Sequence, residues 1–206
     1  MSTAWEDIYR RGEWLEVEPH PEIDKVVELF ETNKIRRILD LGSGGGRHTA
    51  YLAARGFDVY ALDSSPTSLA YIVAVLEKRG LSAHVTLHDM STLPYDSDYF
   101  DAVISVQVIH HNKIDGIRRV VNEITRVLRS EGLTWITVPV SKNEPSKRQV
   151  EIEPGTFLPL DGQEKDLPHH YFKIDEIPSL FPSFLIIDLH VDTTNHFSLL
   201  ARKASR

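Results

Sequence analysis

The sequence contains no cysteine, only two methionines and no long uncharged apolar run. Without cysteine the chain cannot form a disulfide framework, supply a thiol nucleophile or bind zinc or an iron–sulfur cluster through sulfur. No apolar segment reaches the roughly 18–20 residues that a membrane-spanning helix requires. Residues 1–20 are polar and acidic, unlike a signal peptide. From these absences we expect a cytoplasmic protein that does not interact with a membrane.

Basic residues are also in the minority. The chain has 23 lysines and arginines against 30 aspartates and glutamates, a formal net charge of −7. This balance argues against a nucleic-acid partner, because nucleic-acid surfaces carry an excess of positive charge. The 206 residues, 41% of them hydrophobic, suit one domain with a substantial core. We expect a monomer or a homodimer that acts on a small molecule.

Short apolar segments alternate with helical patterns through the first two-thirds of the chain. Ser65 can cap a helix that Pro66 begins and Gly80 ends, and a strongly periodic helix from Ile114 is expected to close near Gly132. The predicted strands are 37–41, 57–63, 83–87, 101–106 and 133–138. This α/β alternation predicts a doubly wound, Rossmann-like, mostly parallel sheet with helices on both faces.

The last third has a different pattern. The apolar segments 184–189 and 196–201 are too close together for a crossover helix, so they predict an antiparallel C-terminal hairpin that completes a seven-stranded sheet. Residues 141–167 lack strong periodicity, and we expect a lid or a mobile insert there. The expected single domain therefore has four parts: an N-terminal cap (1–20), a cofactor-binding core (21–140), an insert (141–175) and the hairpin (176–206).

A glycine-rich turn follows the first predicted strand. It contains Asp40, Gly42, Gly44 and Gly46, at the sheet edge where open parallel sheets bind ligands. Arg47 stands where the dinucleotide fingerprint Gly-x-Gly-x-x-Gly needs its last glycine, and no Gly-Lys-Ser/Thr follows. The turn therefore argues against a nicotinamide oxidoreductase and against a P-loop.

The turn is followed in order by Asp63 at the end of the second strand, Asp89-Met90 after the third, and Leu93-Pro94-Tyr95 before the fourth. With these features, residues 35–140 resemble class I S-adenosylmethionine-dependent methyltransferases, in particular the tellurite-resistance-type and ubiquinone-biosynthesis-type enzymes. The resemblance implies S-adenosylmethionine as cofactor and S-adenosylhomocysteine as its product. It implies that the cofactor is bound by Tyr9, Trp14, Asp40, Gly42, Ser43, Gly44, Gly46, Asp63, Ser64, Asp89, Met90, Val106 and Gln107.

Two pairs of histidines lie where an acceptor would enter. His111, with His110, follows the fourth strand beside the expected methyl group, and we interpret it as a base or an orienting group. His169, His170 and Tyr171 follow the insert and are expected to bind the acceptor. We expect no metal site, because the side chains of adjacent residues point apart and no helical His-x-x-x-His is present.

The expected function is methyl transfer to a small-molecule acceptor through oxygen, nitrogen, sulfur or a metalloid. Two alternatives stay open: a non-catalytic partner subunit that binds S-adenosylmethionine, and an RNA methyltransferase. The acidic balance disfavours the RNA enzyme. So does the sequence after the fourth strand, which lacks the Asn/Asp-Pro-Pro-Tyr/Phe motif of many nucleic-acid amino-methyltransferases.

Overall fold

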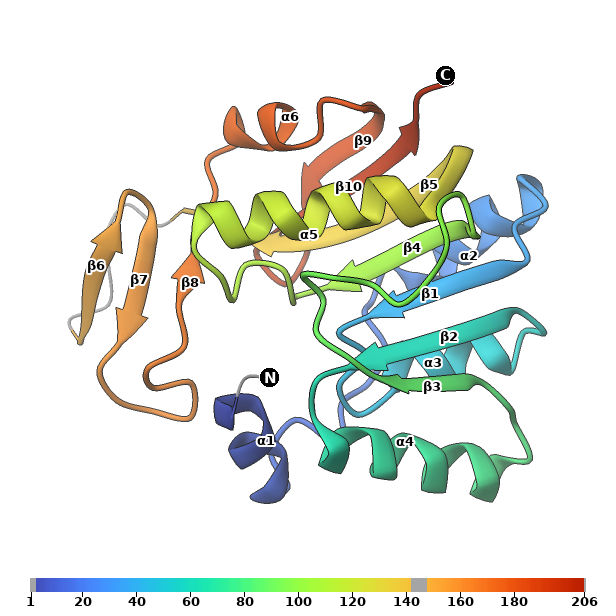
Figure 1. The fold of residues 1–206 in the computed structure, drawn as a ribbon, viewed down its shortest axis with the longest axis horizontal. Coiled ribbons are helices and arrows are strands. Elements are labelled where there is room, and N and C mark those ends of the chain that lie inside the picture. Colours follow the sequence, from blue (N-terminus) through green and yellow to red (C-terminus); the bar gives the residue numbers. More distant parts are fainter. Residues whose placement is uncertain (1–2, 142–147, 206) are drawn as a thin grey trace.

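The computed structural model describes residues 3–141 and 148–205. Its main sheet has seven strands in the order β3-β2-β1-β4-β5-β10-β9 (Figure 1). Only β10 runs antiparallel to its neighbours, β5 and β9, so the predicted fold class is confirmed. The strands are β1 (Arg37–Leu41), β2 (Asp58–Asp63), β3 (His84–Leu87), β4 (Phe100–Val106), β5 (Leu128–Pro139), β9 (Phe184–Val191) and β10 (His196–Lys203).

Helices cover both faces of this sheet. Successive residues along a strand point to opposite faces, and accordingly Leu39 and Val103 pack with α5, whereas Ile38 and Ile104 pack with α2. The helices are α1 (Thr3–Arg10), α2 (Ile23–Thr32), α3 (Arg47–Ala53), α4 (Pro66–Arg79), α5 (Ile114–Val127) and α6 (Glu176–Leu180). Among the described helices, none is both long and apolar enough to cross a membrane.

The predicted signals hold at the ends of α4 and fail at the end of α5. Ser65 accepts a hydrogen bond from the Ser68 N–H, and Gly80 ends the helix with a left-handed φ of 63°. By contrast, α5 ends at Val127, and Leu128 already pairs with β4, so the expected end near Gly132 is wrong. The expectation relied on Gly132 as a helix-ending glycine, whereas the chain already enters β5 at Leu128.

The insert is more regular than its sequence pattern predicts. β6 (Gln149–Glu153), β7 (Thr156–Pro159) and β8 (His169–His170) form a separate three-stranded antiparallel sheet. This small sheet extends beyond the end of β5, near the start of α5 (Figure 1). Part of the expected insert, residues 142–147, and residues 1 and 2 of the expected cap lie outside the described residues.

Candidate active site

A cavity of about 900 Å³ lies where the carboxyl ends of β1, β2, β4 and β5 meet the N-terminal arm (residues 3–20) and the insert. Its position matches the rule that ligands bind outside the carboxyl ends of parallel strands. Sixteen of the predicted site residues line it: Tyr9, Trp14, Asp40, Gly42, Ser43, Gly44, Asp63, Ser64, Asp89, Met90, Val106, Gln107, His110, His111, His169 and Tyr171. Two predicted residues, Gly46 and His170, are not part of the lining.

The conformation of the glycine turn requires glycine at positions 42 and 46. Gly42 has a φ of 73°, and a Cβ atom on it would lie 2.3 Å from Cγ1 of Val108. Gly46 has a φ of 80° at the start of α3, where a Cβ atom would lie 2.6 Å from Cγ1 of Ile72. Gly46 therefore lets α3 pack against α4, while Gly42 keeps the backbone close to the cavity.

Asp63 holds the turn in this shape. Its Oδ2 atom accepts the Gly44 N–H at 2.9 Å, and its Oδ1 atom accepts the Ser65 N–H at 2.9 Å. Burial raises the pKa of Asp63, and these backbone hydrogen bonds oppose that effect. Ser64 and Ser68 also hydrogen-bond to this carboxylate, so the turn uses about all four of its acceptor sites. From sequence, the structural alternative for Asp63 was an acid at a helix N-terminus, and its hydrogen bond to the glycine turn was not predicted.

Asp40 and Arg47 place opposite charges beside the turn. Asp40 is buried and accepts a 2.6 Å hydrogen bond from the Thr49 hydroxyl. Burial raises its pKa to about 6, although Thr49 and Arg47 both act against the rise. The Arg47 guanidinium donates to Gln107 Oε1 at 3.0 Å and to the Glu18 carbonyl at 3.3 Å. Arg47 thus connects the turn to the end of β4 and to the N-terminal arm. From sequence, this residue served only as an argument against dinucleotide binding.

A further carboxylate, Asp89, lies after β3 at the cavity edge and is half-buried. Its Oδ1 atom accepts the Ser91 N–H at 2.8 Å. Hydrogen bonds from Ser91 lower the pKa of Asp89, which keeps the carboxylate ionised. The cofactor half of the cavity is therefore lined by glycine backbone and by acidic side chains. Such a lining suits a ligand with hydroxyl and ammonium groups.

The N-terminal arm closes over the glycine turn. A Cβ atom on Gly44 would lie 2.7 Å from the Tyr9 hydroxyl, and one on Gly45 would lie 2.2 Å from the Leu15 carbonyl oxygen. At its start the arm is held by Glu6, which accepts hydrogen bonds from the Ser65 hydroxyl at 2.6 Å and the Thr67 hydroxyl at 2.7 Å. The contacts of Glu6 and Leu15 had no signal in the sequence, because they depend on how the arm docks.

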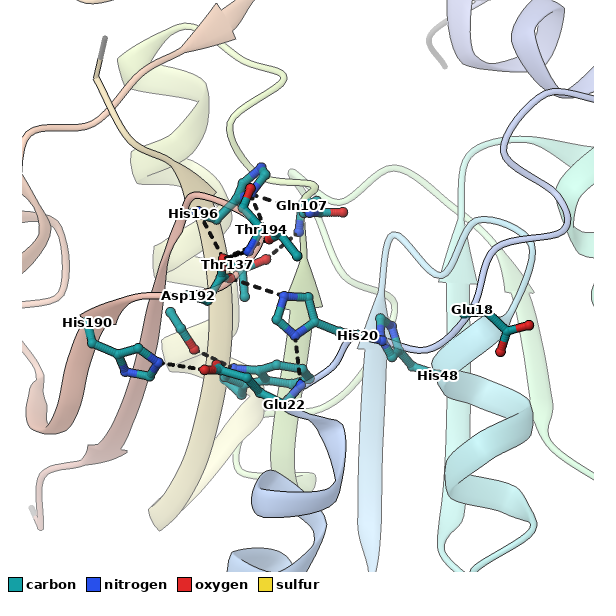
Figure 2. Close-up of polar contacts among 12 residues, drawn as sticks. Glu18, His20, Glu22, His48, Gln107, Thr137, His190, Asp192, Thr194 and His196 are labelled. Atoms are coloured by element: carbon teal, nitrogen blue, oxygen red, sulfur yellow. Dashed lines mark hydrogen bonds and ion pairs between the residues drawn. The ribbon is translucent and has the colours of Figure 1, made fainter.

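The end of the arm is held by a buried polar network (Figure 2). The His20 N–H donates to His48 Nε2 at 3.1 Å, and His20 Nε2 lies 3.1 Å from Asp192 Oδ2. Asp192 Oδ1 in turn accepts the backbone N–H groups of Thr194 at 2.7 Å and His196 at 3.0 Å. Since Thr194 and His196 line the cavity, the network joins the arm and α3 to the β9–β10 turn at the cavity wall.

Three histidine rings meet on the opposite side of the cavity. The His110 and His111 ring centroids are 3.9 Å apart, and that of His169 lies 4.6 Å from His111 and 5.7 Å from His110. The assumption that the adjacent side chains point apart is therefore wrong. A hydrogen bond of 2.9 Å from the His170 N–H to the His110 carbonyl attaches β8 to the loop after β4. Neither β8 nor this contact could be seen in the sequence.

Burial governs the charge state of these rings. It lowers the pKa of His111 to about 3 and holds the pKa of His110 well below its usual value, with neighbouring histidines adding to both effects. Both rings are therefore neutral near pH 7. The His170 side chain lies outside the cavity, with Nδ1 2.8 Å from the Thr156 hydroxyl in the small sheet. It supports the insert, and its predicted contact with an acceptor has no support in its position.

Comparison with known proteins adds to this geometry. Residues 38–132 match the model of a methyltransferase domain family. An uncharacterized methyltransferase of Mycobacterium bovis is 37% identical over 105 residues, which cover 50% of this chain and 40% of that protein. The ubiquinone biosynthesis O-methyltransferase of Rickettsia prowazekii is 28% identical over 122 residues, which cover 57% of this chain and 47% of that protein. The chain therefore spans less than half the length of these two relatives.

Solved structures agree on the fold. A structure described as a SAM-dependent methyltransferase from Methanosarcina mazei superposes with a TM-score of 0.78 at 20% identity, over 92% of this chain and all of the other. At that identity the likeness concerns the fold alone. Together with the matched domain and the glycine turn, it shows that residues 38–132 match a methyltransferase domain on a fold shared with SAM-dependent methyltransferases.

Proposed function

We propose that this chain transfers the methyl group of S-adenosylmethionine to a small-molecule acceptor. The observation that carries the proposal is a single cavity lined by the glycine turn and Asp63 at one end and by His110, His111 and His169 at the other. Its volume of about 900 Å³ lies within the usual range for small-molecule sites. Two ligands bound there would lie side by side, as methyl transfer requires.

The residues of the cofactor half fit S-adenosylmethionine. Asp63 and Asp40 both line the cavity, where the Asp63 carboxylate can accept from ribose hydroxyls and Asp40 from the ammonium group. The Ser43 hydroxyl is buried and has no hydrogen-bond partner among the described residues, so it is free to bind a ligand. The sulfonium of S-adenosylmethionine supplies the activated methyl group, so the protein has to align the acceptor and exclude water. The closed N-terminal arm helps to exclude water.

His111 orients the acceptor in this proposal. A ring whose pKa is about 3 holds a proton too weakly to act as an efficient base near neutral pH. The neutral ring can still accept a hydrogen bond from an acceptor group. Of the two roles that the sequence suggested for His111, a base or an orienting group, the proposal therefore keeps only the orienting role.

The charge of the cavity favours a small molecule over RNA. Its lining contains the cations Arg47, Lys113 and Arg119 and twice as many acids: Asp40, Asp63, Asp89, Asp115, Glu153 and Glu164. Such a lining repels a phosphate backbone. The name of the Rickettsia relative, an O-methyltransferase of ubiquinone biosynthesis, supports an oxygen acceptor.

Calorimetry tests the cofactor half of the proposal. We expect S-adenosylhomocysteine to bind with micromolar affinity, about −8 kcal/mol, and NAD not to bind. Asp63→Asn removes a charge-assisted acceptor worth about 1.5–3 kcal/mol, so the affinity falls about 10- to 150-fold. Asp58→Asn is the matched control, because Asp58 lies on the same strand at the end far from the cavity. Equal affinity of the two variants would contradict the assignment of Asp63.

Turnover tests the acceptor half. The protein is incubated with methyl-labelled S-adenosylmethionine and a metabolite extract, and labelled products are identified by mass. We expect a labelled small molecule whose formation is lost in Asp63→Asn and retained in Asp58→Asn. Labelled RNA, or tight S-adenosylhomocysteine binding without any labelled product from metabolites or RNA, would favour one of the two alternatives instead.

A further inference from the structure

The three histidines at the acceptor end carry an inference beyond methyl transfer itself. One ring nitrogen from each of His110, His111 and His169 lies within 4.8 Å of the corresponding nitrogens of the others. All three residues line the cavity. We propose that this histidine cluster binds one divalent metal ion of the zinc class and that the ion holds the oxygen or sulfur atom of the acceptor. Only the second part rests on the proposed function.

Two of the rings offer buried nitrogen atoms that nothing else uses. The Nδ1 atoms of His110 and His111 are buried and have no hydrogen-bond partner among the described residues. A buried polar atom without a partner costs about 1–3 kcal/mol, so it calls for a ligand. The neutral ring is also the form of histidine that binds a metal ion.

His169 is oriented as a metal ligand usually is. Its Nδ1 donates to the Leu167 carbonyl oxygen at 2.9 Å, so Nε2 is the ring nitrogen that would face an ion, in place of its present hydrogen bond to Glu164. Metal-binding histidines commonly bond a carbonyl or a carboxylate through the second ring nitrogen, which sets the tautomer. Glu164 Oε2 lies 2.9 Å from Nε2, so the carboxylate would lie next to the ion.

The ligand set selects the kind of ion. Three imidazole nitrogens with one open position match zinc and its neighbours in the first transition row, whereas magnesium and calcium prefer oxygen. A tetrahedral ion with bonds of about 2.0–2.1 Å needs ligand atoms about 3.3 Å apart. The three nitrogens, now within 4.8 Å of one another, would therefore have to move closer by small side-chain rotations.

The ion would act on the acceptor. An acceptor O–H or S–H group bound to it loses its proton to Glu164, and the resulting anion attacks the methyl carbon. The carbon–sulfur bond of the donor breaks, and its electron pair returns to sulfur, which yields the methylated acceptor and neutral S-adenosylhomocysteine. A bound divalent ion favours this deprotonation because it stabilises the anion that forms.

A second group of candidate ligands serves as an internal control. His20, Glu22 and Asp192 also offer atoms within 4.8 Å of one another. Their atoms, however, already have partners: His20 lies 3.1 Å from Asp192, and Glu22 Oε1 lies 2.7 Å from His190 Nε2 (Figure 2). This group has no counterpart to the unpartnered Nδ1 atoms of His110 and His111, and we expect no ion there.

The experiment titrates chelator-treated, metal-free protein with Zn²⁺ by calorimetry and with Co²⁺ by visible absorption. We expect one ion per chain, an intense Co²⁺ band typical of four-coordinate nitrogen ligation, and no competition from excess Mg²⁺. His111→Gln removes a ligand and should weaken Zn²⁺ binding at least about 100-fold. Glu164→Gln removes the carboxylate that lies beside His169 Nε2, and with it the negative charge next to the ion, and should weaken Zn²⁺ binding about 10- to 100-fold. Glu22→Gln is the matched control and should leave binding unchanged.

S-adenosylhomocysteine binding is measured on every variant, and a value within about threefold of the parent shows that the variant is folded. If His111→Gln fails to fold, Glu164→Gln decides the question. No Zn²⁺ binding by protein that binds S-adenosylhomocysteine would overturn the metal site and leave the proposed function standing. Zn²⁺ binding that is lost in Glu22→Gln and kept in His111→Gln or Glu164→Gln would also overturn it. Protein that binds Zn²⁺ as expected but not the cofactor product would contradict the proposed function alone.

Discussion

A methyl group added at Gly44 tests whether the N-terminal arm is closed over the glycine turn in solution. In Gly44→Ala the new Cβ atom would lie 2.7 Å from the Tyr9 hydroxyl oxygen. The backbone at Gly44 also has a φ of 54°, which costs a non-glycine residue about 1–2 kcal/mol. The substitution therefore combines a local backbone cost with a clash that exists only when Tyr9 occupies its observed position.

A double-mutant cycle separates the two costs. In Tyr9→Phe the hydroxyl is gone, and the nearest ring atom, Cζ, lies 3.6 Å from the added Cβ, an ordinary contact. We expect Gly44→Ala to cost about 2–4 kcal/mol alone and about 1–2 kcal/mol beside Tyr9→Phe, a coupling of about 1–2 kcal/mol. The coupling free energy has an upper limit, because the arm would detach from the turn if the clash cost more than the docking of the arm contributes.

The assay is urea unfolding of the parent, both single variants and the double variant, with the m value checked for constancy. Gly56→Ala is the matched control, because Gly56 has a φ of 83° but a Cβ there meets no described atom within 4 Å. Its cost should be about 1–2 kcal/mol in both backgrounds. A coupling below about 0.3–0.5 kcal/mol between Gly44 and Tyr9 would refute the closed arm, since unrelated sites add within that range.

Three further predictions concern carboxylates. Burial raises the pKa of Asp40 from 3.8 to about 6, so the free energy of unfolding should fall by about 3 kcal/mol as the pH rises through that range. Urea unfolding of Asp40→Asn, measured from pH 4 to 7, should not show this fall. Burial alone would raise the pKa of Asp192, but its hydrogen bonds lower the pKa overall. Asp192→Asn should therefore reduce the free energy of unfolding by about 1–3 kcal/mol at pH 7, and this difference from the parent should shrink as the pH falls below about 4. Glu6→Ala should speed tryptic cleavage after Arg10, because α1 loses its bonds to the start of α4; an unchanged time course would show that Glu6 does not anchor the arm.

The sheet and the cofactor half of the site could be predicted because their signals are local. The apolar run 37–41 and the glycines after it set a strand and a turn within ten residues of chain. The end of each parallel strand then reaches the same sheet edge, so Asp63 and Asp89 could be placed beside Asp40 without any knowledge of tertiary contacts. Twelve of the predicted residues, those between Asp40 and His111, line one cavity for this reason.

The parts that the sequence did not predict depend on contacts between distant segments. β7 and β8 pair Phe157 with His169, yet neither strand has an alternating pattern long enough to be recognised. Likewise His20 and Asp192 meet only after the arm and the β9–β10 turn have both docked. Propensity and periodicity describe single elements, and they contain no information on such pairings.

The cofactor end and the acceptor end of the site are held by different kinds of contact. The cofactor is bound by backbone geometry that a short stretch of sequence determines, whereas the acceptor end depends on the bond from the His170 N–H to the His110 carbonyl, which brings the insert to the loop after β4. Substitutions in the insert can therefore move His169 relative to His110 and His111 without disturbing the glycine turn. Selectivity for the acceptor, and any metal ion bound with it, should change through the insert while affinity for the cofactor stays constant.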